Sequence, residues 1–152
     1  MKKIILLLPL ILLIGCTNEV EDSKYTYLEY KTELQKQEDF SEEEDIAFDT
    51  YFNIIREDEE VVNYSIVIKN PKIDMHKIKA LFIHDYIQEE AFPSIGIMNE
   101  PVELLKDSKD QIILKGKIQT SEDIRNVNFK LYLEYIDNID QENKIYYQVS
   151  RG

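Results

Sequence analysis

The side chains that could do covalent or metal chemistry are few in this chain. It has one cysteine, Cys16, and two histidines, against 30 Asp and Glu residues. The histidines form no paired-histidine zinc motif, and the four glycines are too far apart to build a phosphate-binding loop. Carboxylate pairs could act as general acid and base, but so many acids make any chosen pair uninformative. We therefore expect no catalytic, metal-binding or cofactor-binding residues.

The two histidines are predicted to lie in different settings. His84 falls on the apolar face of a predicted strand, where a hydrogen-bonded packing histidine is more common than a metal ligand. His76 follows Asp74 and Met75 in a predicted loop, and we expect it to be exposed to solvent.

Cys16 closes an N-terminal segment that has the layout of a secretory signal peptide. Two lysines form a basic head, residues 4–13 form an apolar stretch, and Gly15 directly precedes the cysteine. The stretch is shorter than the roughly 20 residues of a membrane-spanning helix, and Pro9 interrupts it. A retained transmembrane anchor is therefore the less favoured interpretation.

The residues Leu13-Ile14-Gly15-Cys16 resemble the lipobox of bacterial membrane lipoproteins. The resemblance implies cleavage between Gly15 and Cys16, diacylglycerol on the Cys16 thiol, palmitate-like acyl chains, and a place on the outer, extracytoplasmic face of the cell membrane. Lipidation also accounts for a lone cysteine, which an exported protein cannot pair internally. The alternative is an ordinary signal peptide or an uncleaved apolar tail, with Cys16 present by chance.

The length and charge of the chain after residue 15 limit what kind of domain this signal would export. Removing residues 1–15 takes away two lysines and no acids, so the formal net charge changes from -12 to -14. We predict a lipidated tether over 16–24 and a single extracytoplasmic domain over 25–152. The acidity disfavours nucleic acid and anionic lipid as partners and favours cationic peptides, metal cations or basic proteins. The simpler interpretation is that it keeps a tethered domain soluble.

Two acidic clusters could collect a cation or a basic partner. Residues 42–45 and 57–60 would neighbour each other across a predicted hairpin. Neither cluster has the alternating oxygen ligands and central glycine of a calcium loop, so we favour solvated turns.

Aromatic residues offer a further candidate surface. Tyrosine supplies a large contact area at low entropic cost, so tyrosines exposed on a sheet could form a recognition surface, although core packing explains most of them equally well. The tyrosines in question are Tyr25, Tyr27, Tyr30, Tyr132, Tyr146 and Tyr147.

Apolar alternation predicts short strands along most of the body. The predicted strands cover 47–55, 61–69, 77–86, 111–120, 127–135 and 144–149, with a short edge strand near 95–98. Residues 88–92 could form one helical turn, and residues 25–34 a first strand or an irregular lead.

One segment supports two interpretations. Ser41 to Glu44 fits a helix capping box, with apolar residues at helical spacing behind it. Residues 46–54 also alternate as a strand would, and a polar turn and a second alternating segment follow. We favour a hairpin that pairs 47–55 with 61–69.

These elements predict an all-β fold, an antiparallel β-sandwich of about seven strands with an immunoglobulin-like arrangement. The prediction depends on strand number and spacing, because the core disulfide and the tryptophan of antibody domains are absent. A small α+β domain with a helix over Ser41 to Ile55 is the alternative.

The sequence therefore favours a non-enzymatic binding module at the bacterial cell envelope, held by its lipid and recognising a protein, peptide or other envelope component. A lipoprotein that gives immunity by sequestering a cationic antimicrobial peptide is a second hypothesis, supported by charge and location. An envelope hydrolase that uses carboxylates or a metal is the third, and it requires a concave site with converging acids and shifted pKa values.

Overall fold

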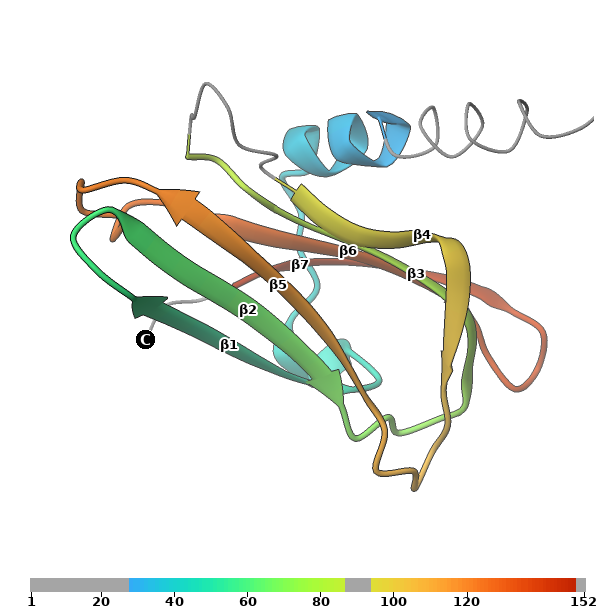
Figure 1. Cartoon of the computed structure of the whole chain (residues 1–152). Coiled ribbons are helices and arrows are strands. Elements are labelled where there is room, and N and C mark those ends of the chain that lie inside the picture. Colours follow the sequence, from blue (N-terminus) through green and yellow to red (C-terminus); the bar gives the residue numbers. More distant parts are fainter. Residues whose placement is uncertain (1–27, 87–93, 150–152) are drawn as a thin grey trace, which may run out of the picture.

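The structure, a computed structural model, describes residues 28–86 and 94–149. The predicted signal, Gly15, Cys16, the tether and the helical turn at 88–92 lie outside the described residues. The described residues form seven strands in two antiparallel sheets (Figure 1). The strands are β1 (Asp49–Arg56), β2 (Val61–Lys69), β3 (Met75–His84), β4 (Ser94–Leu104), β5 (Gln111–Gln119), β6 (Phe129–Ile136) and β7 (Glu142–Gln148).

The two sheets have the strand order of an immunoglobulin-like sandwich. Sheet A is β1-β2-β5, and sheet B is β4-β3-β6-β7. In immunoglobulin-like sandwiches the first, second and fifth strands share one sheet, while the third, sixth and seventh share the other. Here β4 pairs with β3 in sheet B, where the constant type of antibody domain places its fourth strand in the first sheet. The prediction of an antiparallel β-sandwich of about seven strands is confirmed.

The core lies between the sheets, where alternate residues of each strand meet. Side chains of a strand point to opposite faces in turn, so the apolar residues at every second position share the inner face. The inward residues of the central strands include Val62, Tyr64, Ile66 and Ile68 of β2, Ile78, Ala80 and Phe82 of β3, and Phe129, Leu131 and Leu133 of β6.

The predicted hairpin is confirmed, and the alternative helix over Ser41 to Ile55 is wrong. β1 and β2 pair from Asp49 opposite Lys69 to Arg56 opposite Val62. Only the short 3-10 helix η1 (Glu43–Asp45) precedes β1. In the strand, the alternating apolar side chains all point into the core between the two sheets. In a helix, the same residues would point in several directions and could not all be buried there.

Residues 28–36 form a helix, so the strand or irregular lead expected over 25–34 is wrong for the described part of that range. The helix lies on the side of sheet B that faces away from sheet A (Figure 1). Leu34 is fully buried there against Leu81, Ile83 and Tyr132. Tertiary packing of one apolar side chain, more than local propensity, explains so short a helix.

Sheet B differs from the prediction at one end. β4 is longer than the edge strand expected at 95–98 and continues through Pro101, which an edge strand tolerates because its open side needs no N–H donor. β3 begins at Met75, so His76 lies in a strand and not in a loop. The register of β3 shifts next to His76, and Lys77 there has a positive φ of 51°.

Candidate binding surface

The two sheets leave two outer faces, and sheet B is partly covered. The helix over 28–36 places Tyr30 on Tyr132, with their ring centroids 4.6 Å apart. Tyr132 is fully buried, and Tyr146 packs on its other side at 5.4 Å. Tyr147 points into the core between the sheets. These tyrosines therefore pack the sandwich, and Tyr25 and Tyr27 lie outside the described residues.

Glu134 joins the helix to sheet B through its carboxylate. Its Oε2 accepts hydrogen bonds from the hydroxyls of Tyr30 at 2.9 Å and Tyr132 at 2.5 Å, and its Oε1 lies 3.1 Å from Nζ of Lys79. Burial opposes ionisation of Glu134, but the two tyrosine hydrogen bonds and Lys79 outweigh it and lower its pKa. Burial and the neighbouring carboxylate raise the pKa of Tyr30 to about 12. This network links the helix to sheet B through the ionised carboxylate of Glu134 and two neutral tyrosine hydroxyls.

Beside the helix, the uncovered part of sheet B forms a polar groove of about 440 Å³. Lys77, Lys79 and Lys144 line it together with Glu134 and Glu142. Lys79 already pairs with Glu134, so the charges of the groove are largely balanced within it.

No helix of the described residues covers the outer face of sheet A, which combines exposed apolar, amide and lysine side chains. We call it the sheet A face. Its nine residues are Tyr51, Asn53 and Ile55 of β1, Asn63, Ser65 and Val67 of β2, and Ile113, Lys115 and Lys117 of β5. The cross-strand register arranges them in three rows, of which Tyr51, Val67 and Ile113 form an apolar one.

The apolar members of the sheet A face are unusually open to solvent. Tyr51 is 51% exposed, Ile55 is 55% exposed and Ile113 is 40% exposed. Nζ of Lys69 lies over the face of the Tyr51 ring, 4.1 Å from its centroid, and makes a cation–π contact. Exposed apolar groups gathered on one face are typical of interaction sites.

The electrostatics of the sheet A face differ from those of the whole chain. Its nine residues include two lysines and no acid, whereas acids make up 30 of the 152 residues of the chain. Asp49 and Glu57 border it at its two ends. The Asn63 hydrogen bond at 2.9 Å, and then Lys117 at 3.5 Å, hold the pKa of Glu57 below its usual range.

A hollow of about 310 Å³ lies in the middle of this face. Asn53, Asn63 and Ser65 line it with polar groups, while Ile55 and the two lysines complete its rim. A cavity of this size accommodates a protruding side chain of a partner, with amide and hydroxyl groups available for hydrogen bonds.

The close packing beneath the hollow depends on Gly116. Gly116 of β5 lies opposite Tyr64 of β2, and a Cβ at residue 116 would come within 2.3 Å of the end of the Tyr64 ring. The ring is buried and contacts Phe82, His84 and Phe129 at centroid distances of 5.9, 5.4 and 5.1 Å. The aromatic ring occupies the inner-face space that a side chain at residue 116 would need.

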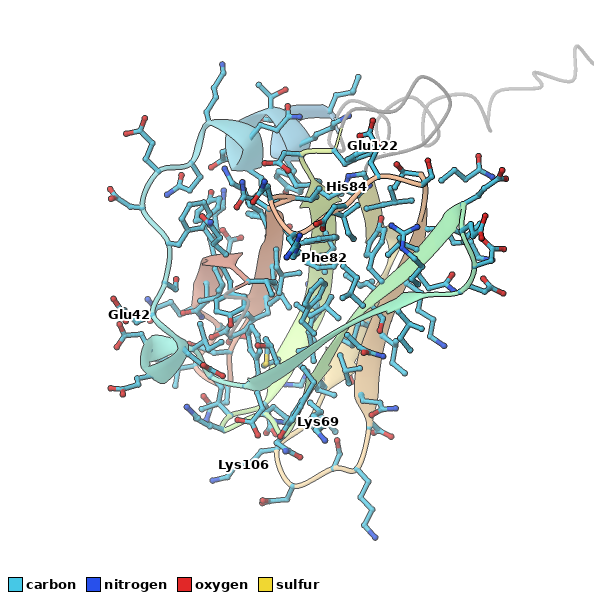
Figure 2. The ribbon with its side chains drawn as sticks, turned by 90° about the vertical axis from the view of Figure 1, so that its left-hand side faces the viewer. Glu42, Lys69, Phe82, His84, Lys106 and Glu122 are labelled. Carbon is cyan, nitrogen blue, oxygen red and sulfur yellow. The ribbon has the colours of Figure 1, made fainter. Side chains whose placement is uncertain are left out.

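His84 is a packing residue, as predicted, but it lacks the predicted hydrogen bond. It is 4% exposed and lies between the sheets with Phe82 (Figure 2). Within the described part of the chain, neither ring nitrogen has a hydrogen-bond partner. Burial lowers the pKa of His84, because the protonated imidazole loses its hydration there.

Residues 42–45 and 57–60 are exposed, as expected of solvated turns, but the surroundings of His76 and the distance between the two clusters differ from the predictions. His76 is partly buried, with Nδ1 3.1 Å from Oε1 of Glu103 on β4. The clusters 42–45 and 57–60 lie at opposite ends of β1, whose eight residues separate them by roughly 25 Å. In the described ranges, no group of three or more His, Cys, Asp or Glu residues is placed to hold a metal ion.

Comparison with known proteins adds no family. No protein-family model matches the chain, and no curated protein matches it significantly. Of the helices in the described residues, none is long and apolar enough to cross a membrane.

Proposed function

We propose that this protein is a bacterial lipoprotein, held by a lipid on Cys16 at the outer face of the cell membrane, and that it works there as a non-enzymatic binding module. The lipobox-like residues 13–16 support the anchor. The sheet A face supports the binding role. The partner that we propose is an envelope protein that docks on this face.

One observation carries the binding role: the sheet A face combines exposed apolar side chains with an absence of acids, in a chain that is otherwise strongly acidic. Charged residues, and acids in particular, are depleted at the centres of protein interfaces, while tyrosine is enriched. Tyr51 and Ile55 project from β1, and Ile113 projects from β5 across the same face. Soluble domains normally cover such a face or use it.

The position of the helix over 28–36 favours the same face. The chain enters the sandwich through this helix, which lies on sheet B. Residues 16–27 span at most roughly 40 Å, so a lipid on Cys16 would tether the domain from its sheet B side. The sheet A face is on the opposite side of the sandwich, away from this point of attachment.

The charges of this face also indicate the class of partner. Lys115 and Lys117 lie on it, with Glu57 3.5 Å from Lys117 at one end, and Lys69 and Asp49 border it at the other end. A cationic peptide would be repelled here, so we favour a protein surface that is neutral or acidic and that offers an apolar side chain to the hollow.

The described carboxyl groups whose pKa values are lowered are poor candidates for a catalytic general acid. As with Glu134, hydrogen bonds lower the pKa values of Asp123 and Asp137, from Arg125 and from the backbone N–H of Gln141 respectively. A catalytic general acid needs its pKa raised, as burial without donors achieves. The shifted carboxyl groups act here as acceptors that organise turns.

The anchor is tested by Cys16→Ser. We expect the wild-type chain to take up a radioactive fatty acid and to fractionate with membranes, and the variant to lose the label. A variant that is labelled as strongly as the wild type would contradict the anchor.

Two charge-reversal variants test the binding face: one changes the sheet A face, and the other is a control elsewhere on the surface. Lys115→Glu combined with Lys117→Glu changes the sheet A face, while Lys106→Glu combined with Lys109→Glu makes the same change in charge at the exposed β4–β5 turn. Each chain is used to capture proteins from solubilised membranes. We expect the first pair alone to lose a partner that the wild type retains, by about tenfold if two close charge contacts are reversed. Equal recovery by both variants would contradict the proposal.

A further inference from the structure

The outer edge of β1 is open for hydrogen bonding. In the described residues β2 pairs with one side of β1, and no strand pairs with the other. The N–H of Glu57 donates to the carbonyl of Val61 at 2.9 Å, which fixes the alternation of hydrogen bonds along the hairpin. It follows that Thr50, Phe52 and Ile54 direct their N–H and C=O groups away from β2. Such a row of groups is a template for a further strand.

The edge of β1 also lacks the features that protect edges. Its residues 50–55, Thr-Tyr-Phe-Asn-Ile-Ile, contain no charge, proline or glycine. By contrast, β5 carries Lys115 and Lys117, and β4 contains Pro101. The edge of β7 receives a hydrogen bond of 2.7 Å from the N–H of Ser41 to the carbonyl of Tyr146. Lysine, proline and covering segments are the usual defences against pairing between molecules, and within residues 28–86 and 94–149 the β1 edge has none of them.

The side chains of β1 are complementary to a second β1 in antiparallel register. With Asn53 opposite Asn53 of a second copy, Tyr51 lies opposite Ile55 on the outward face. On the inward face Phe52 lies opposite Ile54. Both exposed apolar residues of β1 thereby gain an apolar neighbour, and aromatic–aliphatic pairs of this kind stabilise sheets.

Other registers are less favourable. A shift by one residue would turn the apolar side chains of one copy to the opposite face. A shift by two places Tyr51 opposite Asn53 or opposite Glu57, so that the outward pair of Tyr51 with Ile55 is lost. In the favoured register Asp49 meets Glu57 only at the two ends of the pair, where solvent and salt screen their repulsion.

We propose that two copies of this chain associate through their β1 edges about a two-fold axis at Asn53. The two copies of sheet A then form one continuous six-stranded sheet, and their sheet A faces become one surface. A single strand pair is a small interface, so the dimer is weak and depends on local concentration. This association requires neither the lipid on Cys16 nor a partner on the sheet A face.

The geometry of the axis gives a direct test by disulfide formation. Asn53 and its copy are a non-hydrogen-bonded pair with Cα atoms about 4.5 Å apart, which suits a disulfide. Asn53→Cys is made in the full chain, and membranes are treated with an oxidant. Ser65→Cys is the matched control, because Ser65 lies next to Asn53 in the same row, but its two copies would be about 15 Å apart. We expect about tenfold more disulfide-linked dimer from Asn53→Cys.

A second change tests the edge itself. Ile55→Lys, added to Asn53→Cys, places a charge beside the proposed axis and should reduce the cross-link to the level of the Ser65→Cys control. Ile113→Lys makes the same change on β5 and should leave the cross-link intact. Equal cross-linking of the two cysteine variants, no cross-link in either, or a cross-link that resists Ile55→Lys would each overturn the proposal. None of these results bears on the binding of an envelope protein to the sheet A face.

Discussion

Replacement of Gly116 by alanine tests whether the close packing of sheet A is understood. The new Cβ would meet Cζ and Oη of Tyr64 at 2.3 Å and its Cε1 at 2.9 Å. The ring cannot retreat, because it is 2% exposed and lies against Phe82, His84 and Phe129. Overpacking of this kind costs about 1–3 kcal/mol, and replacing a strand glycine returns roughly 0.5–1 kcal/mol.

We therefore expect Gly116→Ala to lower the free energy of unfolding by about 1 kcal/mol and Tm by about 3–5 °C. Urea and thermal unfolding of the purified protein measure both quantities. Lys115→Ala is the control, since an exposed neighbour on the same strand should change stability by no more than about 0.5 kcal/mol.

The clash predicts strong coupling between Gly116 and Tyr64. In a Tyr64→Leu background the space is open, so Gly116→Ala should be neutral or slightly stabilising, and the double-mutant cycle should give a coupling of about 1–2 kcal/mol. A cost of Gly116→Ala that is the same in both backgrounds would refute this account of the packing.

Two further predictions concern buried side chains. The folded protein holds the pKa of His84 below its ordinary value of 6.5, so the unfolded chain binds the proton more tightly and stability should fall as the pH decreases below about 6.5. In urea titrations between pH 7 and pH 5, His84→Leu should flatten this dependence of stability on pH. An unchanged slope in that variant would contradict the prediction. Leu34→Ala should cost about 2–4 kcal/mol of helix docking and expose the amides of 28–36 to hydrogen exchange, while the amides of β2 stay protected. Full protection of the helix in that variant would show that Leu34 does not hold it.

The sequence predicted those strands that bury one face in the core. In β2, β5 and β6 apolar residues occupy every second position, and the sandwich uses this period directly. The same alternation placed Tyr51 and Ile55 on the outward side of the hairpin, where the structure has them. β4 was underestimated because Gly96 and Pro101 break its pattern, although an edge strand tolerates both residues.

The helix over 28–36, and which outer face of the sandwich stays exposed, could not be predicted from hydrophobic alternation. Residues 28–36 are helical because Leu34 and Tyr30 pack on sheet B, and contacts between segments so distant leave no local pattern. That helix buries Tyr132 on sheet B, whereas no described helix covers the outward side of sheet A. Its position therefore determines which aromatic side chains are exposed to a partner. Glu134 and its ion-pair partner Lys79 hold the helix on sheet B, but in the sequence they cannot be told from ordinary surface residues.

The central claim is that the sheet A face binds an envelope protein, and site-specific photo-cross-linking tests it most directly. A photoreactive residue is placed at Ser65, in the middle of the face, or at Lys106, in the exposed β4–β5 turn, and intact cells are irradiated. We predict a discrete adduct with another envelope protein from residue 65 and none from residue 106, with adducts between two copies of the chain separated by mass. The absence of such an adduct from residue 65, or the same adduct from both positions, would contradict the claim.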